Sequence, residues 1–170
     1  MISNTKKRRG FLKAGILLAG SYMSFPAVGG SANPTNLLQH KEPLNPELVK
    51  EFVAKAHKDL DSVKMLLEKE PNLLNVAWDW GLGDFETAIA GAGHMGRVDI
   101  AEFLLSKGAR MDVFVAAMLG KLDIVKSTLE AFPQLKYSKG PHGIMLLHHA
   151  RQGKENAKPV LDYLMEIGAT

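Results

Sequence analysis

The sequence predicts an all-α protein: a solenoid of about four helix pairs with short hairpin loops between them. The first observation is internal repetition, since the apolar spacing of residues 96–105 returns at residues 120–129 and 58–67, and more faintly at 160–165. Self-similarity at a period of tens of residues is typical of stacked repeats. The second is that apolar residues recur every three or four positions within each copy, as on one face of a helix.

Length and charge narrow the class of protein. A chain of 170 residues is suited to one domain. Residues 1–32 hold five of the 21 basic residues and no acid, so the remainder carries a net charge of about −2. A mildly acidic body argues against nucleic acid as a partner. The absence of cysteine excludes disulfides, thiolate metal ligands and a cysteine nucleophile.

Residues 1–32 are organised like an export signal. A basic start leads into an apolar run at residues 14–20, too short for a bilayer span of about 20 residues, and a small-residue region ends at Ala32. The run Arg-Arg-Gly-Phe-Leu-Lys at 8–13 resembles the twin-arginine signal. The resemblance implies transport by the twin-arginine machinery, cleavage near Ala32, and a periplasmic protein without a stable membrane span. The motif residues are Arg8, Arg9, Phe11, Leu12 and Lys13. A basic or disordered tail is the alternative interpretation.

Residues 33–45 form a proline-punctuated linker, and the repeat domain is expected at residues 46–170. Asn45, Pro46 and Glu47 predict a helix start, because Asn caps helices, Pro suits the first turn and an acid complements the helix dipole. Further along, we expect Asp99 and Asp123 to cap the helices of their repeats.

The second copy carries the fullest repeat motif. The matching residues are Thr87, Ile89, Ala92, Gly96, Ile100, Ala101, Leu104, Leu105, Gly108 and Ala109. This pattern resembles the ankyrin repeat, although Ala88 and Ala90 replace the usual Pro and His. The resemblance covers about residues 48–169 and implies an L-shaped stack with a concave binding face. It also implies that His148 is a structural histidine that hydrogen-bonds backbone between repeats.

A nucleotide-binding alternative shares the same stretch. Gly91 to Gly96 reads G-x-G-x-x-G, which would make the protein an NAD(P)-dependent oxidoreductase. That motif indicates nucleotide binding only when a buried strand precedes it and an acidic residue follows about 20 residues later. Residues 85–90 are too polar for such a strand, and residues 116–118 hold no acid. We therefore expect a protein-binding module, neither an enzyme nor a cofactor protein.

The partner-binding surface is expected on the concave face and on a long loop at residues 75–85, which holds both tryptophans. Tryptophan dominates binding hot spots, although the indoles could instead fold back and shield the stack. The candidate residues are Trp78, Asp79, Trp80, Asp84, His94, Met118, Lys139, His142 and His149.

Metal binding and catalysis find little support in the sequence. His142, His148 and His149 lie close together, and three imidazoles can hold zinc. No acid completes a known ligand spacing, and no catalytic motif is present. The sequence therefore predicts no metal site.

Overall fold

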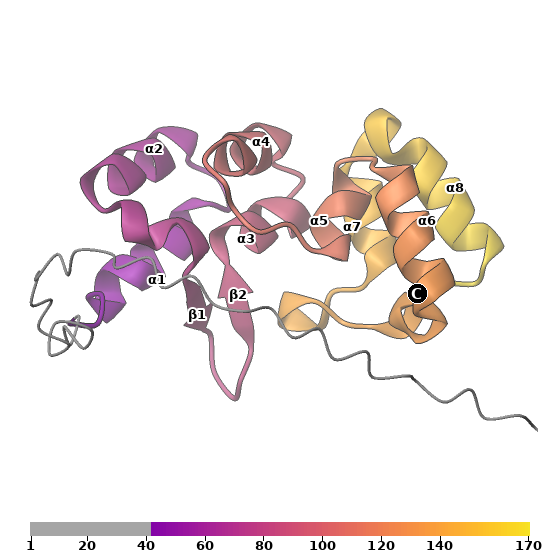
Figure 1. Ribbon diagram of the computed structural model, residues 1–170, viewed down its shortest axis with the longest axis horizontal. Coiled ribbons are helices and arrows are strands. Elements are labelled where there is room, and N and C mark those ends of the chain that lie inside the picture. The colour runs from indigo at the N-terminus through magenta and orange to yellow at the C-terminus, as the bar shows by residue number, and fades with distance from the viewer. Residues whose placement is uncertain (1–41) are drawn as a thin grey trace, which may run out of the picture. The chain divides into compact units, whose positions relative to one another are not determined.

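A computed structural model describes residues 42–170, so the predicted export signal and most of the linker lie outside the described residues. The described part is mostly helical, as expected, and its chain order alternates short helices with turns (Figure 1). The α-helices are α1 (Pro46–Lys55), α2 (Leu60–Lys69), α3 (Ala88–His94), α4 (Val98–Ser106), α5 (Val113–Met118), α6 (Leu122–Ala131), α7 (Leu146–Gln152) and α8 (Lys158–Glu166). The shorter elements are the strands β1 (Ala77–Asp79) and β2 (Phe85–Thr87) and the 3₁₀ helices η2 (Pro71–Asn75), η3 (Pro133–Tyr137), η4 (Pro141–Gly143) and η5 (Lys154–Ala157).

The eight α-helices pack as four consecutive pairs. The two helices of each pair are in contact, and α1, α3, α5 and α7 form a row in which each helix contacts the next. The second helices touch one another as well, α2 against α4 and α6 against α8. Figure 1 shows the pairs following one another from α1 and α2 to α7 and α8. Short helices cannot bury their apolar stripes alone, so this neighbour-to-neighbour packing supplies the core.

The helix starts follow the local sequence in part. The Asn45 side chain accepts a hydrogen bond from the Glu47 amide at 2.9 Å, as predicted. Asp59 caps α2, and its hydrogen bonds with the hydroxyl and amide of Ser62 lower the pKa of this carboxyl to about 2. The expectation for Asp99 and Asp123 was wrong, because the residues at the start of α4 and α6 are Arg97 and Lys121.

The reason is that glycines fix the turns before these two helices. Gly96 and Gly120 both adopt a left-handed conformation, with φ of 68° and 69°, and the helix begins two residues later. Asp99 therefore lies inside the first turn, where it pairs with Arg97 at 2.6 Å and still complements the helix dipole.

The predicted long loop is a β-hairpin that turns back onto the stack. Strands β1 and β2 pair antiparallel, with Trp78 opposite Glu86, and Asp79 accepts hydrogen bonds from the amides of Gly81 and Gly83 at the tip. Because side chains alternate across a strand, Glu86 points inward between the outward-facing Phe85 and the half-buried Thr87.

This hairpin is the only sheet among residues 42–170, so the described residues lack the buried parallel strand that the G-x-G-x-x-G turn requires. The G-x-G-x-x-G glycines do not form a phosphate-binding turn after a buried parallel strand, since Gly91 and Gly93 lie inside α3. A β-carbon at Gly93 would lie 3.1 Å from the Val115 side chain, so this glycine permits close helix packing.

Candidate metal centre

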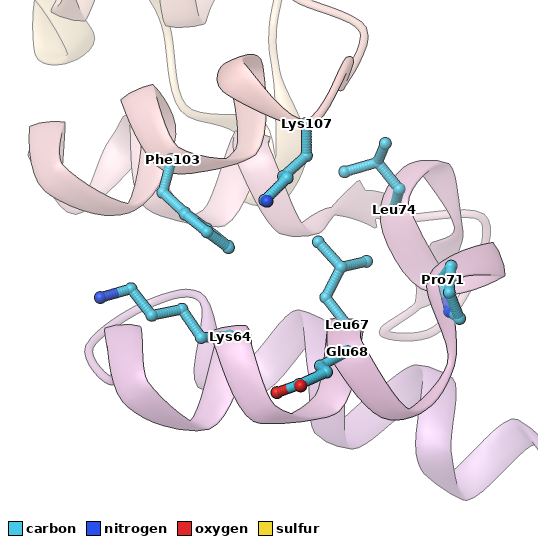
Figure 2. A pocket seen from close by; sticks show the side chains of 7 residues that line it. All are labelled: Lys64, Leu67, Glu68, Pro71, Leu74, Phe103 and Lys107. Carbon is cyan, nitrogen blue, oxygen red and sulfur yellow. The ribbon is translucent and has the colours of Figure 1, made fainter.

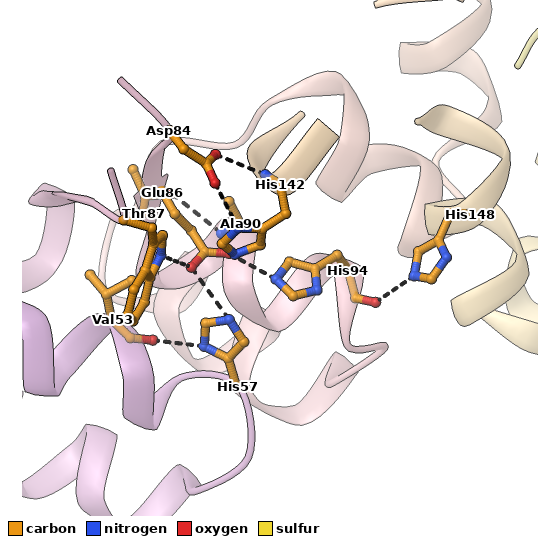
Figure 3. Close-up of polar contacts among 10 residues, drawn as sticks. Val53, His57, Asp84, Glu86, Thr87, Ala90, His94, His142 and His148 are labelled. Carbon is orange, nitrogen blue, oxygen red and sulfur yellow. Dashed lines mark hydrogen bonds and ion pairs between the residues drawn. The ribbon is translucent and has the colours of Figure 1, made fainter. Parts of the chain in front are cut away.

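Four side chains from separate segments converge at the hairpin. His57 follows α1, Glu86 lies in β2, His94 ends α3, and His142 lies in η4 before α7. One ligand atom from each of these four residues lies within 4.8 Å of the other three. Figure 3 shows the rings of His57, His94 and His142 around the Glu86 carboxylate.

Glu86 is the centre of this cluster. The whole residue is 1% exposed, and Trp80 Nε1 donates a hydrogen bond to its Oε2 at 2.7 Å. The Nε2 atoms of His94, His57 and His142 lie 2.8, 3.3 and 3.4 Å from the carboxylate oxygens. Burial alone raises the pKa of Glu86, but the hydrogen bonds from His57 and His94 outweigh it and hold the pKa well below its usual range. Glu86 is therefore a buried, ionised carboxylate.

Outer hydrogen bonds orient two of the imidazoles. His57 Nδ1 donates to the Val53 carbonyl at 3.0 Å, and His142 Nδ1 donates to Asp84 Oδ2 at 2.8 Å. Each ring is thereby turned so that Nε2 faces the cluster. A histidine whose other nitrogen is held by a carbonyl or carboxylate is the arrangement that metal-ligating histidines usually show.

The His142 backbone is held in place as well as its ring. Its φ of 58° is uncommon for a residue other than glycine. The Asp84 carboxylate accepts from both the His142 amide and its Nδ1, each at 2.8 Å. The tip of the hairpin thus positions a ligand that lies far along the chain, and these hydrogen bonds lower the pKa of Asp84.

Gly91 makes room for His57. A β-carbon at Gly91 would lie 2.8 Å from His57 Cε1 and 3.0 Å from Nδ1, closer than β-carbons approach other atoms. The hydrogen bond with Glu86 raises the pKa of His57, although burial opposes this. The glycine that suggested a phosphate turn therefore serves the histidine cluster.

The predicted site residues divide into two groups. Trp80, Asp84, His94 and His142 are brought together at the cluster. Met118 and His149 are 0% and 1% exposed, and His94 is 7% exposed, so the expectation that these three side chains face a partner was wrong. Met118 belongs to the buried core, since α5 packs between α3 and α7, and His149 packs beside the rings of Phe114 and His94.

The remaining candidates lie apart from the cluster. Trp78 packs against the core beside α1, with Lys50 Nζ 5.7 Å from its ring centre. Asp79 holds the hairpin turn. Lys139 is exposed and borders a separate cavity of about 370 Å³ that also touches Asp84 and Asp112. The Trp78 indole thus folds back onto the stack, whereas Trp80 is 38% exposed and turns its Nε1 toward Glu86, and the hairpin also presents Leu82 and Phe85 to solvent.

Of the three histidines that lie close together in the sequence, His142, His148 and His149, only His142 belongs to the cluster. His148 Nε2 donates to the His94 carbonyl at 3.0 Å, which is the backbone bond between repeats that the resemblance implied. His149 Nδ1 donates to the Met145 carbonyl at 2.9 Å, and burial lowers the pKa of His149. His57 and Glu86 were missed. The sequence feature that could have pointed to Glu86 is its position as a single acid in β2, directly before α3, the helix that carries His94.

A larger groove lies between α2 and α4, with a volume of about 440 Å³ (Figure 2). It is lined by Leu67, Leu74, Pro71 and Phe103 together with the charged Lys64, Lys107 and Glu68. Lys64 and Lys107 each lie within 6 Å of the Phe103 ring centre. This groove gathers no histidine or paired acid, so it offers no site chemistry comparable with the cluster.

The fold and the cluster together define an all-α protein with a candidate metal centre. Comparison of the sequence with known protein families and with curated proteins gives no match. None of the helices in residues 42–170 is long and apolar enough to cross a bilayer. Three imidazole nitrogens and one carboxylate oxygen form a donor set that suits zinc and the later first-row transition metals.

Proposed function

We propose that this protein binds one divalent transition-metal ion, with zinc as the best match, through His57, Glu86, His94 and His142. The observation that carries the proposal is the convergence of three Nε2 atoms and one carboxylate within 4.8 Å. Borderline-soft Zn²⁺ takes such mixed nitrogen and oxygen ligands at about 2 Å, in a tetrahedral arrangement that short side-chain movements would allow.

Charge supports a metal ion over a simple hydrogen-bond network. Three imidazoles can all donate to one carboxylate only if their Nε2 atoms are protonated, and His57 and His142 then carry protons on both nitrogens. Two doubly protonated rings then face the same Glu86 carboxylate, and their positive charges repel each other. A divalent cation removes this conflict, because neutral imidazoles then present their Nε2 lone pairs to the ion and Glu86 supplies negative charge.

Metal titration of the full, untagged chain tests this proposal. After chelation and dialysis, calorimetry is expected to show about one Zn²⁺ per chain. His142→Ala should weaken affinity by more than the roughly 10–100-fold that loss of an outer-shell partner costs. His142 suits the test because it lies in an exposed turn. His148→Gln is the matched control, since it removes an imidazole outside the cluster and should leave the affinity unchanged. Equal affinity in His142→Ala and wild type would contradict the proposal.

We also propose that the scaffold is an ankyrin-type stack that docks a protein partner after export to the periplasm. The four helix pairs and the repeat motif support the stack. Exposure of Leu82 and Phe85 on the hairpin supports docking at its tip, since large apolar side chains in a glycine-flanked turn are suited to an apolar pocket. The twin-arginine-like motif at residues 8–13 supports export.

One fractionation experiment addresses both parts of this second candidate. Arg8→Lys with Arg9→Lys should leave the chain in the cytoplasm, because a receptor reads the arginine pair as an address. Wild type should capture a periplasmic protein that the Leu82→Ser, Phe85→Ser variant releases. An undiminished periplasmic signal from the lysine variant would contradict export by the twin-arginine route. Capture of the same protein by the serine variant would contradict docking at the hairpin tip.

A further inference from the structure

A small cavity adjoins the histidine cluster on its solvent side. Its volume is about 260 Å³, and it is lined by Ala54, His57, Trp80 and His142. We propose that the metal ion, held by four protein donor atoms, takes a fifth ligand from this cavity, and that this ligand is a small carboxylate with a short apolar tail. This inference rests on the proposed metal centre and adds that the centre takes an external ligand.

Exposure of the four ligand side chains differs between the two sides of the cluster. Glu86 and His94 form its inner side, with side chains 0% and 8% exposed. His57 and His142 form its rim, with side chains 20% and 34% exposed, and both border the cavity. Since the inner side is sealed and the rim is open, an additional ligand reaches the ion from the cavity between the two rim histidines.

Glu86 supplies a single oxygen to the ion. Trp80 Nε1 donates to Oε2 at 2.7 Å, and this oxygen also lies 3.3 Å from His57 Nε2; Oε1 faces His94 and His142 and is the oxygen assigned to the ion. The protein therefore provides four donor atoms, three nitrogens and one oxygen. Zinc expands to five-coordinate when a ligand or transition state requires it, so a fifth position is chemically accessible.

The cavity walls select the class of ligand. A divalent ion with three neutral imidazoles and the Glu86 carboxylate retains one positive charge, which favours an anionic oxygen donor. The Ala54 methyl and the Trp80 indole offer apolar contact beside it. Asp84 bonds to the outer nitrogen of His142, and this second carboxylate disfavours a multiply charged anion such as phosphate. A monocarboxylate with a short hydrocarbon tail can bind the ion through its carboxylate and contact Ala54 and Trp80 through its tail.

Cobalt substitution tests the inference on the full chain, because tetrahedral and five-coordinate Co²⁺ differ in their visible absorption. Titration of the Co²⁺-loaded protein with sodium propionate should shift and weaken the visible bands with saturation, and inorganic phosphate at equal ionic strength should not. Ala54→Leu fills the cavity without removing a ligand. It should keep the cobalt bands and weaken the propionate response by about tenfold or more, because the larger side chain takes the space that the propionate tail needs.

Each failure has a distinct meaning. Cobalt bands that propionate leaves unchanged would overturn the fifth coordination position and leave the metal centre intact. A response to phosphate alone would overturn the carboxylate assignment, and an undiminished response in Ala54→Leu would overturn the cavity as the entry side. Absence of cobalt bands under all conditions would overturn the metal centre and the inference with it.

Discussion

Replacement of Glu86 by Gln is expected to lower the free energy of unfolding of the metal-free protein by about 3–5 kcal/mol, the usual cost of removing one partner of a buried ion pair. The Glu86 carboxylate is fully buried and receives Trp80 Nε1 and three histidine Nε2 atoms. A glutamine has the same shape but carries no charge, and its amide presents two hydrogens to groups that are themselves donors. Urea denaturation of the chelated protein measures the loss.

The size of this loss should depend on pH in a defined direction. The pKa of Glu86 is lowered in the folded state, so its contribution is present above its ordinary value of 4.5 and is lost as pH falls through the folded pKa. The pKa of His57 is raised, so its contribution is complete below 6.5 and is lost as pH rises through the folded pKa. The difference between wild type and Glu86→Gln should therefore be largest between pH 4.5 and pH 6.5.

Glu102→Gln provides the matched control for this prediction. Glu102 is exposed on α4, and surface substitutions of this kind change stability by about 0.5 kcal/mol or less. If Glu86→Gln is as stable as Glu102→Gln, the buried carboxylate does not organise the cluster, and the electrostatic argument for a cation at this site fails.

Zinc is expected to stabilise the folded chain strongly. An ion that binds only the native state adds about 2.7 kcal/mol to the free energy of unfolding at a free concentration 100 times its dissociation constant. The effect reaches across the stack, because the ligands lie after α1, in β2, at the end of α3 and before α7. Helix pairs otherwise contact mainly their neighbours, so the ion should also sharpen cooperative unfolding. Thermal and urea unfolding with zinc and with chelator measure both effects.

Gly91→Ala separates the metal effect from general stability. Alanine favours a helix interior by up to about 1 kcal/mol over glycine, so a loss of helix is not expected. Its β-carbon would meet the His57 ring at 2.8 Å and displace that ligand. The variant should therefore remain folded and lose most of the zinc-dependent stabilisation. A full zinc effect in Gly91→Ala would show that His57 is not a ligand.

Local patterns in the sequence determined the helices. The spacing of Val63, Leu66 and Leu67 places them on one buried face of α2, because a helix repeats every 3.6 residues whatever it packs against. Asn45 caps α1 through a hydrogen bond with an amide two residues away, which the local sequence determines. His148 bonds to the His94 carbonyl, as its position in the repeat motif implied. Asp99 and Asp123 do not cap α4 and α6, since the left-handed glycines Gly96 and Gly120 each fix a helix start two residues later.

The tertiary structure alone decided the site. His57 and His142 belong to different helix pairs, and their Nε2 atoms meet only because the hairpin carries Glu86 inward and its tip fixes His142 through Asp84. The spacing of these residues along the chain does not predict that His57 and His142 lie at the same site. Burial of Met118 and His149 likewise depends on how α3, α5 and α7 pack against one another. The helical repeat follows from side-chain periodicity along the chain, whereas a ligand set drawn from four segments follows from how the folded chain brings distant residues together.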